Sequence, residues 1–373
     1  MSASKRRFRA ITGFVLSSAL LLAASCWPHR DRAVAAIAAD EMATLQSSLK
    51  QKLGARSESF SVSLKGKATT AEVSKAFDAV LAGDDYLKFA IRSYRFAVST
   101  DRRASTLTFT MKYWENAAQT AYVNARSKEI LAKIVTKDMN AHQKVKAIHD
   151  WVLLNVAYDR TLVRHSAYDA LKSGLTVCQG YATLTYRLLT DAGIPARIVE
   201  GTVNTGAHAW NLVKLDGVWY QLDTTFDDPV PDVKGRTTYG YYLVTDGQLK
   251  QDHSWKTGYP QAVTAYKNTL DSLIAKDKGR TAFYQSVRED IGADYLEPSR
   301  TVSTVKEIAA QLRSAAASGR SEAKMRYTSE DKPDLDALLK LMPELSSVRY
   351  TMESMAGGEP GDSLLTVTFK LRQ

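Results

Sequence analysis

Cysteine is almost absent from this sequence, which has two among 373 residues, Cys26 and Cys178. If Cys26 is lipidated or removed with an N-terminal leader, the mature chain keeps one thiol and cannot form an internal disulfide. A lone cysteine is either a small buried core residue or a reactive one. The surroundings of Cys178 must therefore decide between an inert thiol and a nucleophile.

Other features are scarce as well. The sequence has 9 prolines, 20 glycines and no low-complexity tract, which argues against a disordered chain. It has no stripe of Arg and Lys interleaved with aromatic residues, so nucleic acid is not an expected partner. The formal net charge of +10 is a modest basic excess that favours anionic lipid headgroups or cell-wall polymers. The length and the 45% hydrophobic content predict a globular protein of two or three domains.

The N-terminus has the charge order of an export signal. Four cations, Lys5, Arg6, Arg7 and Arg9, precede an uncharged stretch over residues 10–25 that is rich in Leu, Ala and Val. Residues 22–26, Leu-Ala-Ala-Ser-Cys, resemble a bacterial lipoprotein box, and this resemblance implies lipidation of Cys26 and attachment to the membrane. An ordinary signal-peptidase site at residues 33–35, giving a secreted protein, and an uncleaved anchor are the alternatives. All three place the folded part outside the cytoplasm.

Two regions of similar pattern flank a central one. The first is predicted to contain a helix over residues 42–53, a strand over 58–64, a helix over 71–81 and strands over 89–98 and 106–114. The last repeats this order with a helix over 305–317, a strand over 322–328, a helix over 335–341 and strands over 347–352 and 364–371. The final strands, at 107–113 and 365–371, share a period-two pattern residue by residue. We interpret the two regions as a duplicated α-β-α-β-β module, with chance similarity as the alternative.

The predicted domain boundaries follow from this pattern. They are a signal peptide with lipobox over 1–26, a tether over 27–39, a first α+β module over 40–117, a central domain over 118–260, a helical connector over 261–302 and a second module over 303–373. The central domain opens with a helix over 120–135. A second helix begins at Asn140 and Gln143, which form a capping-box pattern. We expect His149 and Trp151 on this helix to be packing residues.

Cys178 lies at the predicted start of a helix. Residues 174–195 have the pattern of a loop, an apolar helix and a Gly-Ile-Pro stop, and Thr176 is a candidate N-cap. In the first turn of a helix the unpaired N–H groups and the dipole favour a thiolate. Gly180 would allow a substrate or the backbone to approach closely. A buried, inert cysteine is the alternative for this segment.

A hairpin follows that places a histidine near an aspartate. Residues 207–215 form a predicted strand, Asp216-Gly217 is a type I′ turn signal, and residues 218–223 return. A two-residue turn fixes the register, so that Trp210 faces Asp223, and His208 lies diagonally beside Asp223 on the same face. Their Cβ atoms are expected about 7 Å apart, within reach of an imidazole–carboxylate hydrogen bond.

Three motifs in this order resemble the transglutaminase-like superfamily, which has a papain-type fold. They are Val-Cys-Gln-Gly-Tyr at 177–181, His-Ala-Trp-Asn at 208–211, and Gly-Val-Trp-Tyr at 217–220 with Leu-Asp-Thr-Thr-Phe-Asp-Asp at 222–228. The resemblance spans about residues 130–256, and residues 158–159, 168–171, 241–244 and 252–255 are similar to bacterial members. It implies an α+β fold with an antiparallel sheet and a nucleophile helix. It also implies that Cys178 is the nucleophile, His208 the base and then the acid, and Asp223 the residue that orients His208.

The resemblance leaves the surroundings of the triad open. The Cys178 N–H would meet the oxyanion, Tyr168 is a candidate second donor, and Gln179 and Trp210 are candidate groove residues. The aromatic cluster of Tyr181, Trp210, Trp219 and Tyr220 is interpreted as packing between helix and sheet, with a groove lining as the alternative. We expect no cofactor and no metal, because the histidines lack metal-ligand spacing. His29, His142 and His165 are assigned to loop or tether positions.

We interpret two further features as structural. Asp227 and Asp228 are expected in a solvated turn rather than a Ca²⁺ site, and His253 is expected to be a structural histidine near the domain edge. The predicted function is extracytoplasmic, thioester-mediated acyl transfer or hydrolysis of peptide or protein amides. The alternative is a slow or inactive scaffold whose modules bind a cell-wall polymer or another partner at the envelope.

Overall fold

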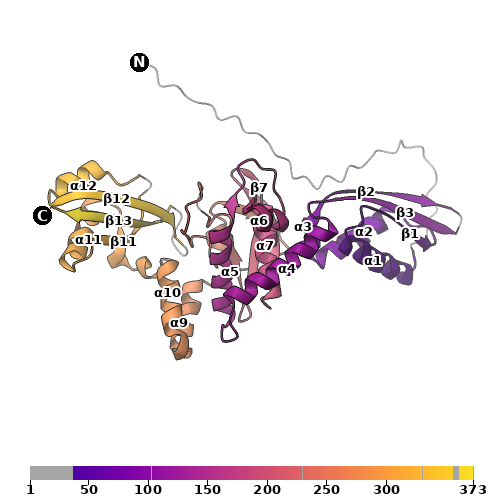
Figure 1. The fold of residues 1–373 in the computed structure, drawn as a ribbon, viewed down its shortest axis with the longest axis horizontal. Helices are drawn as coiled ribbons and strands as arrows, with labels where there is room; N and C mark the ends of the chain where they lie inside the picture. Colours follow the sequence, from indigo (N-terminus) through magenta and orange to yellow (C-terminus); the bar gives the residue numbers. More distant parts are fainter. Residues whose placement is uncertain (1–36, 102, 229, 330, 356–360, 373) are drawn as a thin grey trace, which may run out of the picture. The chain divides into compact units, whose positions relative to one another are not determined.

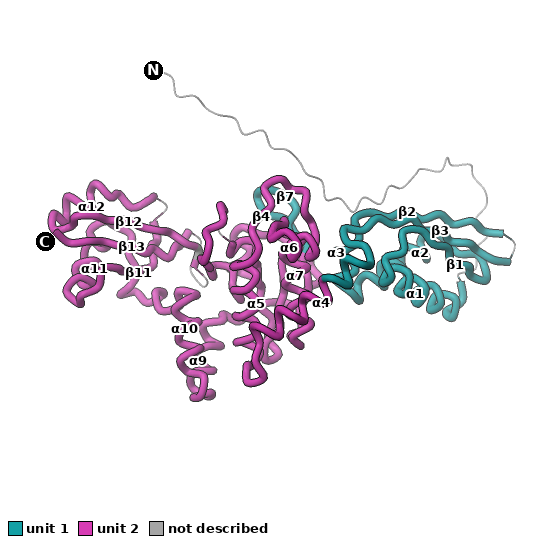
Figure 2. Tube along the Cα trace, in the orientation of Figure 1, with its two compact units in different colours: residues 1–122, 200–208 teal, residues 123–199, 209–373 magenta. Residues whose placement is uncertain are grey.

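The computed structural model describes residues 37–101, 103–228, 230–329, 331–355 and 361–372, in two compact units (Figures 1 and 2). One unit holds the described residues up to 122 together with 200–208, and the other holds 123–199 and the described residues from 209 onward. Among the described residues no helix is long and apolar enough to cross a membrane. The candidate lipidation site Cys26 lies outside the described residues.

The first unit is built on a small antiparallel sheet covered by helices. Its elements are α1 (Ala39–Gly54), β1 (Ser59–Lys65), α2 (Thr70–Ala82), α3 (Asp85–Ala90), β2 (Ile91–Thr100) and β3 (Ala104–Tyr113), with strand order β1-β3-β2. Alternate residues of β1 and β3 are buried against the helices, where Phe60, Phe77 and Phe109 stack in the core. The sequence missed α3, which occupies the start of the strand predicted from residue 89.

The C-terminal region has a related layout. It contains β10 (Thr301–Val302), α11 (Val305–Ala317), β11 (Glu322–Tyr327), α12 (Leu335–Leu341), β12 (Leu345–Ser354) and β13 (Ser363–Leu371), with strand order β10-β11-β13-β12. In the first unit β3 lies between β1 and β2 and is antiparallel to both. In the C-terminal region β13 lies between β11 and β12 and is antiparallel to both. This shared topology agrees with the interpreted repeat, while duplication itself stays a prediction.

The central region holds the helices and the sheet that carry the candidate site. Its elements are α4 (Ala117–Ile134), α5 (Ala141–Asn155), β4 (Ala157–Tyr158), α6 (Ala167–Ser173), β5 (Leu175–Thr176), α7 (Cys178–Asp191), β6 (Ala196–Val203), β7 (Gly206–Leu215), β8 (Val218–Leu222), α8 (Asp246–Leu249) and β9 (His253–Trp255). The four longer strands form a sheet of order β8-β7-β6-β9. Leu184, Leu188 and Leu189 of α7 are fully buried, as the apolar stripe predicts. The predicted capping box of Asn140 and Gln143 is confirmed at the start of α5.

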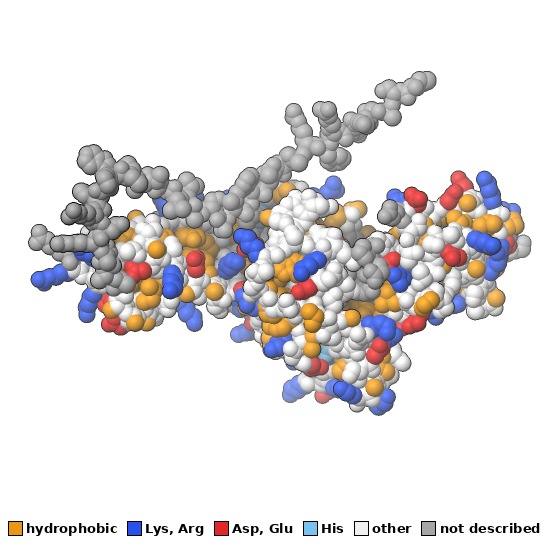
Figure 3. Space-filling view, turned by 180° about the vertical axis from the view of Figure 1, so that it is seen from behind, with side chains coloured by type: hydrophobic (Ala, Val, Ile, Leu, Met, Phe, Trp, Pro, Cys, Tyr) orange, Lys and Arg blue, Asp and Glu red, His pale blue; other side chains and the backbone are white. Residues whose placement is uncertain are grey.

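A helical segment follows the central region. It consists of α9 (Tyr266–Lys276), η1 (Lys278–Arg280), α10 (Thr281–Asp290), η2 (Ala293–Leu296) and η3 (Pro298–Arg300). On the face of the molecule drawn in Figure 3, the described Lys and Arg side chains are scattered among acidic and apolar ones. This face therefore presents no continuous basic stripe.

Candidate active site

Cys178 is the first residue of α7, and its side chain is half-buried. The N-cap position is held by Val177, and no side chain caps the helix. Thr176, the predicted N-cap, instead belongs to β5, and its hydroxyl donates to the Arg164 carbonyl at 3.1 Å. That assignment was wrong by one position because the short strand continues to the residue before Val177. Cys178 nevertheless lies where the helix dipole is positive.

Gly180 is required for packing beneath the cysteine. A Cβ atom at this position would lie 1.8 Å from the Thr176 hydroxyl and 2.8 Å from the Ser166 carbonyl oxygen. The sequence left open whether Gly180 admits a substrate or the chain's own backbone. The structure shows the chain's own residues close to it. The glycine therefore lets α7 lie directly against Thr176 of β5 and Ser166, which caps α6.

The hairpin has the predicted register. Leu215 pairs with Val218, Val213 with Tyr220 and Asn211 with Leu222. Asp216 and Gly217 have φ values of 48° and 87°, as a type I′ turn requires. One more step along this register brings Trp210 opposite Asp223, the first residue after β8.

Asp223 is buried and fixed on all sides. Its Oδ1 accepts hydrogen bonds from the backbone N–H groups of Thr225 at 2.8 Å and Phe226 at 3.2 Å. Its own N–H donates to the Tyr241 carbonyl oxygen at 3.1 Å. Its Oδ2 lies 3.1 Å from Nε2 of His253. The carboxylate can therefore not rotate without breaking several of these bonds.

His208, Asp223 and His253 form one buried cluster. Each offers a nitrogen or oxygen atom within 4.8 Å of those of the other two. Such a set has the residue types of a metal site. However, Oδ1 of Asp223 is already taken by two backbone donors, and its Oδ2 lies at hydrogen-bond distance from His253. We interpret the cluster as a hydrogen-bonded chain, and the expected absence of a metal stays a prediction.

His253 was expected to be structural, and the structure places it directly against Asp223. Its other ring nitrogen, Nδ1, contacts Oδ1 of Asp252, whose second oxygen accepts the Tyr241 hydroxyl. The rings of Trp210 and Phe226 pack against the imidazole with centroid separations of 5.1 and 4.6 Å. Burial opposes the charged ring, but the hydrogen bonds to Asp223 and Asp252 outweigh it and raise the pKa of His253. β8 and β9 stand at opposite ends of the strand order, and Asp223 lies just beyond the end of β8, so the contact joins segments that are not neighbouring strands.

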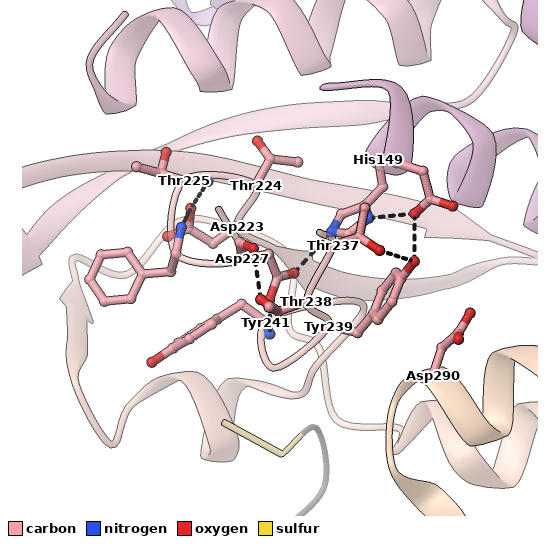
Figure 4. Close-up of polar contacts among 12 residues, drawn as sticks. His149, Asp223, Thr224, Thr225, Asp227, Thr237, Thr238, Tyr239, Tyr241 and Asp290 are labelled. Atoms are coloured by element: carbon pink, nitrogen blue, oxygen red, sulfur yellow. Dashed lines mark hydrogen bonds and ion pairs between the residues drawn. The ribbon is translucent and has the colours of Figure 1, made fainter. Parts of the chain in front are cut away.

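A second buried histidine, on α5, contacts Asp227, which lies four residues after Asp223 (Figure 4). Nε2 of His149 is 3.0 Å from Oδ2 of Asp227, and its Nδ1 is 3.1 Å from Oδ1 of Asp150. The other oxygen of Asp227 accepts the Tyr241 N–H at 2.8 Å. Burial raises the pKa of Asp227 to about 6, although the bond to His149 opposes that shift. His149 is buried, as expected of a packing residue, and it also forms two hydrogen bonds.

The predicted solvated turn at Asp227 and Asp228 was wrong, because their side chains are 0% and 3% exposed. Asp228 accepts a hydrogen bond from the hydroxyl of Tyr181, which is itself buried on α7. Burial raises the pKa of Asp228 to about 7, and the bond to Tyr181 only partly opposes this shift. The two carboxylates thus tie the turn after Asp223 to α5 and to α7.

The other sequence candidates lie in varied surroundings. Trp210 is 1% exposed, and its indole N–H donates to Gln221 at 2.7 Å. Tyr181 and Tyr220 are also buried, which agrees with the packing interpretation of the aromatic cluster. Gln179 is buried and Tyr168 is half-buried, and their proposed roles stay predictions.

The assignment of His142 to a loop was wrong. His142 is buried in the first turn of α5, where it contacts the Tyr266 hydroxyl at 2.9 Å. Its second nitrogen is 3.1 Å from Asp216 at the hairpin turn. The capping box of Asn140 and Gln143 was the available signal, because it places His142 in the first turn of the helix. His165 lies in a loop as expected, and His29 lies outside the described residues.

Comparison with known proteins identifies the fold of the central region. Residues 128–224 match the family model described as the transglutaminase-like superfamily. The central region of this chain is a transglutaminase-like domain. The matched residues include Cys178, His208 and Asp223, the three positions that the sequence motifs single out.

Similar proteins match part of this chain. The kyphoscoliosis peptidase of Homo sapiens is 25% identical over 171 residues, which are 38% of this chain and 26% of that protein. An uncharacterized protein of Mycobacterium leprae (strain TN) is 33% identical over 124 residues, 29% of this chain and 44% of that protein. A solved structure described as a TGase covers 45% of this chain and 51% of its own, with 13% identity and a TM-score of 0.25. The chain thus spans less than half the length of these curated relatives.

Proposed function

We propose that the transglutaminase-like domain is a thiol-dependent enzyme that transfers or hydrolyses acyl groups of peptide or protein amides. Cys178 is the nucleophile, His208 the general base and then acid, and Asp223 the residue that orients His208. The observation that carries the proposal is the buried, backbone-fixed carboxylate of Asp223 within 4.8 Å of a nitrogen of His208. An ionised carboxylate in such a position needs a cationic or donor partner to offset its desolvation.

The proposed reaction has two steps. His208 accepts the thiol proton, and the Cys178 thiolate attacks the amide carbonyl to form a tetrahedral intermediate. This intermediate collapses to a thioester as the C–N bond breaks, and the leaving amine or ammonia takes the proton from His208. A water molecule or a second amine then attacks the thioester, giving up a proton to His208, and the thiolate leaves. Water yields hydrolysis, and an amine yields a new amide.

Hydrolysis and transfer differ only in the second nucleophile. The name of the human relative, a peptidase, favours hydrolysis, although the match covers 26% of that protein. We further propose that the domain acts outside the cytoplasm, held at the membrane through a lipid on Cys26 or through an N-terminal anchor. Support comes from the cationic segment and the apolar stretch over residues 10–25 that precede Cys26. A cell-wall polymer is the corresponding candidate partner of the flanking modules.

The thiol chemistry can be tested without a known substrate. In a Cys26→Ser background Cys178 is the only thiol, so its alkylation by iodoacetamide can be followed by intact mass. At pH 6 we expect the folded chain to react at least about tenfold faster than the same chain unfolded in urea, because a paired cysteine is a thiolate at this pH. His208→Ala should remove the advantage.

Two outcomes would count against the enzyme. A thiol that reacts only after unfolding would mean a buried structural cysteine and would favour the scaffold alternative. A thiol that reacts quickly and is indifferent to His208→Ala would mean activation without the proposed base. If the expected result is found, release of peptides from casein and incorporation of dansylcadaverine into casein would separate hydrolysis from transfer.

A further inference from the structure

One carboxylate in the candidate site faces two histidines. We propose that His253 is a positioning residue for the reaction, which holds Oδ2 of Asp223 and, as a buried cation, sets the upper pH limit at which His208 keeps its proton. The inference rests on the proposed function, because it concerns the same triad. It assigns a role to a residue that the sequence motifs left as structural.

The hydrogen-bond geometry requires two protons on the His253 ring. Nε2 faces Oδ2 of Asp223 at 3.1 Å, and Nδ1 faces Oδ1 of Asp252. Ionised carboxylates only accept hydrogen bonds, so both ring nitrogens must donate. A neutral imidazole donates from one nitrogen only. His253 is therefore an imidazolium between two carboxylates unless one of these is protonated.

The surroundings of the ring support this charge state. The side chain of His253 is 0% exposed, and that of Asp252 is 39% exposed. A buried cation is stable only when it is paired, and His253 has two anionic partners. The pKa shifts agree: burial works against both charged groups, but their mutual hydrogen bond contributes to raising the pKa of His253 and lowering that of Asp252.

Four titratable groups face His253 from the elements around it. Asp223 follows β8, Asp252 precedes β9, His208 lies on β7, and Tyr241 lies in the segment between β8 and α8. The Tyr241 ring centroid is 5.7 Å from that of His253, and its hydroxyl is bound to Asp252. The remaining ring neighbours, Trp210 and Phe226, carry no charge.

The charge of His253 has a definite effect on His208. A cation close to a second imidazole makes protonation of that imidazole less favourable. It also engages Asp223, so that less of the carboxylate's negative charge is available to stabilise a protonated His208. Loss of the His253 charge should therefore let His208 hold its proton to a higher pH. A residue that only fills space would not change this limit.

The test compares two alkylating reagents on the full chain with Cys26→Ser. Iodoacetate is an anion, so its reaction with the Cys178 thiolate is favoured by a protonated His208, whereas iodoacetamide is neutral. The ratio of the two rates against pH therefore reports loss of the His208 proton. In His253→Gln, which keeps one donor but no charge, we expect the inflection of this ratio to move up by about one pH unit. The main series of measurements contains a chelator, and a parallel series omits it.

Two further variants keep the test decisive. His149→Gln makes the same change at the neighbouring pair, between Asp150 and Asp227, and should leave the inflection in place. Asp252→Asn changes a partly exposed side chain and lets His253 become neutral, so it should move the inflection in the same direction by a smaller amount. If His253→Gln does not fold, this second variant decides the question.

The outcomes separate the possibilities. An inflection that is unchanged in His253→Gln, or in Asp252→Asn where the former does not fold, overturns the inference and leaves His253 as a packing residue. A shift that exists only without chelator also overturns it, because a bound metal would then explain the cluster. Failure of the unsubstituted folded chain to react at all would instead contradict the proposed function.

Discussion

His149 and His253 are both buried, and each lies between two carboxylates, yet their surroundings differ. The carboxylate that His149 holds, Asp227, is bound on its other oxygen by the Tyr241 N–H. The carboxylate that His253 holds, Asp223, lies within 4.8 Å of His208. The two histidine–aspartate pairs therefore differ in the second neighbour of the carboxylate, which is a backbone N–H for Asp227 and the His208 imidazole for Asp223.

The two pairs also differ in how they are anchored. Asp150, the second partner of His149, is bound by Lys146 at 2.6 Å and by the Tyr239 hydroxyl at 3.0 Å, so this network extends along α5. Asp252, the second partner of His253, is bound by Tyr241 at the domain surface. We therefore assign the His149 network to stability and the His253 network to the candidate site.

The largest predicted effect on stability is the loss of His149. His149→Ala leaves the carboxylate of Asp227 buried without its charged partner, and we expect the free energy of unfolding to fall by about 3 kcal/mol or more. Urea unfolding followed by circular dichroism measures this change. A loss below about 1 kcal/mol would mean that the network contributes little to the fold.

A smaller loss is expected at Gly180, where packing alone is at stake. Gly180→Ala would bring a methyl group to 1.8 Å from the Thr176 hydroxyl and 2.8 Å from the Ser166 carbonyl oxygen. We expect a loss of about 1–3 kcal/mol in the free energy of unfolding, because the hydroxyl can rotate but the backbone must shift. Gly235→Ala, at a position with no atom within 4 Å of the added Cβ but with φ +81°, provides a comparison in which strain acts without a clash. Equal stability of Gly180→Ala and the parent would contradict the packing account.

The pH dependence of stability should distinguish the charged His149 from a neutral one. The hydrogen bonds to Asp150 and Asp227 outweigh burial and raise the pKa of His149 above its ordinary 6.5. Its charge therefore stabilises the fold fully below pH 6.5, and this contribution is lost as the pH rises through the folded pKa. In His149→Gln the total decline in unfolding free energy above pH 6.5 should be smaller. The difference should be about 1.4 kcal/mol for each unit by which the folded pKa of His149 exceeds 6.5. Parallel curves for parent and variant would show that His149 is neutral.

The smallest effect is expected for Asp228→Asn at acidic pH. Burial raises the pKa of Asp228 to about 7, against the opposing bond from Tyr181, so at pH 5 the folded protein holds this group mainly as a neutral acid. Asparagine resembles that form, and below pH 3.8, where Asp228 is neutral in the folded and in the unfolded chain, we expect a change within about 0.5 kcal/mol. Between pH 3.8 and pH 7 the parent loses stability because its unfolded chain ionises before its folded chain does, so at pH 7 the variant should be the more stable of the two. A variant that is less stable both below pH 3.8 and at pH 7 would contradict this assignment.

Local sequence signals predicted much of the fold. The Asp216-Gly217 turn fixed the hairpin register, and the bounds of α11 and α12 coincide with the periodic apolar segments. The parts that were missed depend on distant residues. Asp227 and Asp228 have the composition of a solvated turn, but their partners His149 and Tyr181 lie 78 and 47 positions earlier. No local pattern contains that information.

The sequence predicted only part of the candidate site, because one of its residues comes from a distant segment. His208 and Asp223 are joined by one tight hairpin, so the register alone places them on one face. His253 lies 30 positions beyond Asp223, on a strand at the opposite edge of the sheet. Its contact with Asp223 joins segments that are not neighbouring strands, and strand periodicity does not predict such a contact. The motif at residues 252–255 was the available signal, and it gave no role.

The most direct test of the division between the two networks pairs Asp223→Asn with Asp227→Asn. Alkylation of Cys178 by iodoacetamide at pH 6 is measured in the Cys26→Ser background, together with the urea midpoint of each variant. Our account predicts that Asp223→Asn slows alkylation about tenfold or more at pH 6, because an amide neither orients nor stabilises a protonated His208. Asp227→Asn should lower the urea midpoint while the folded fraction reacts at the parent rate. Equal slowing of alkylation by both substitutions would contradict the assignment of Asp223, and not Asp227, to the thiol site.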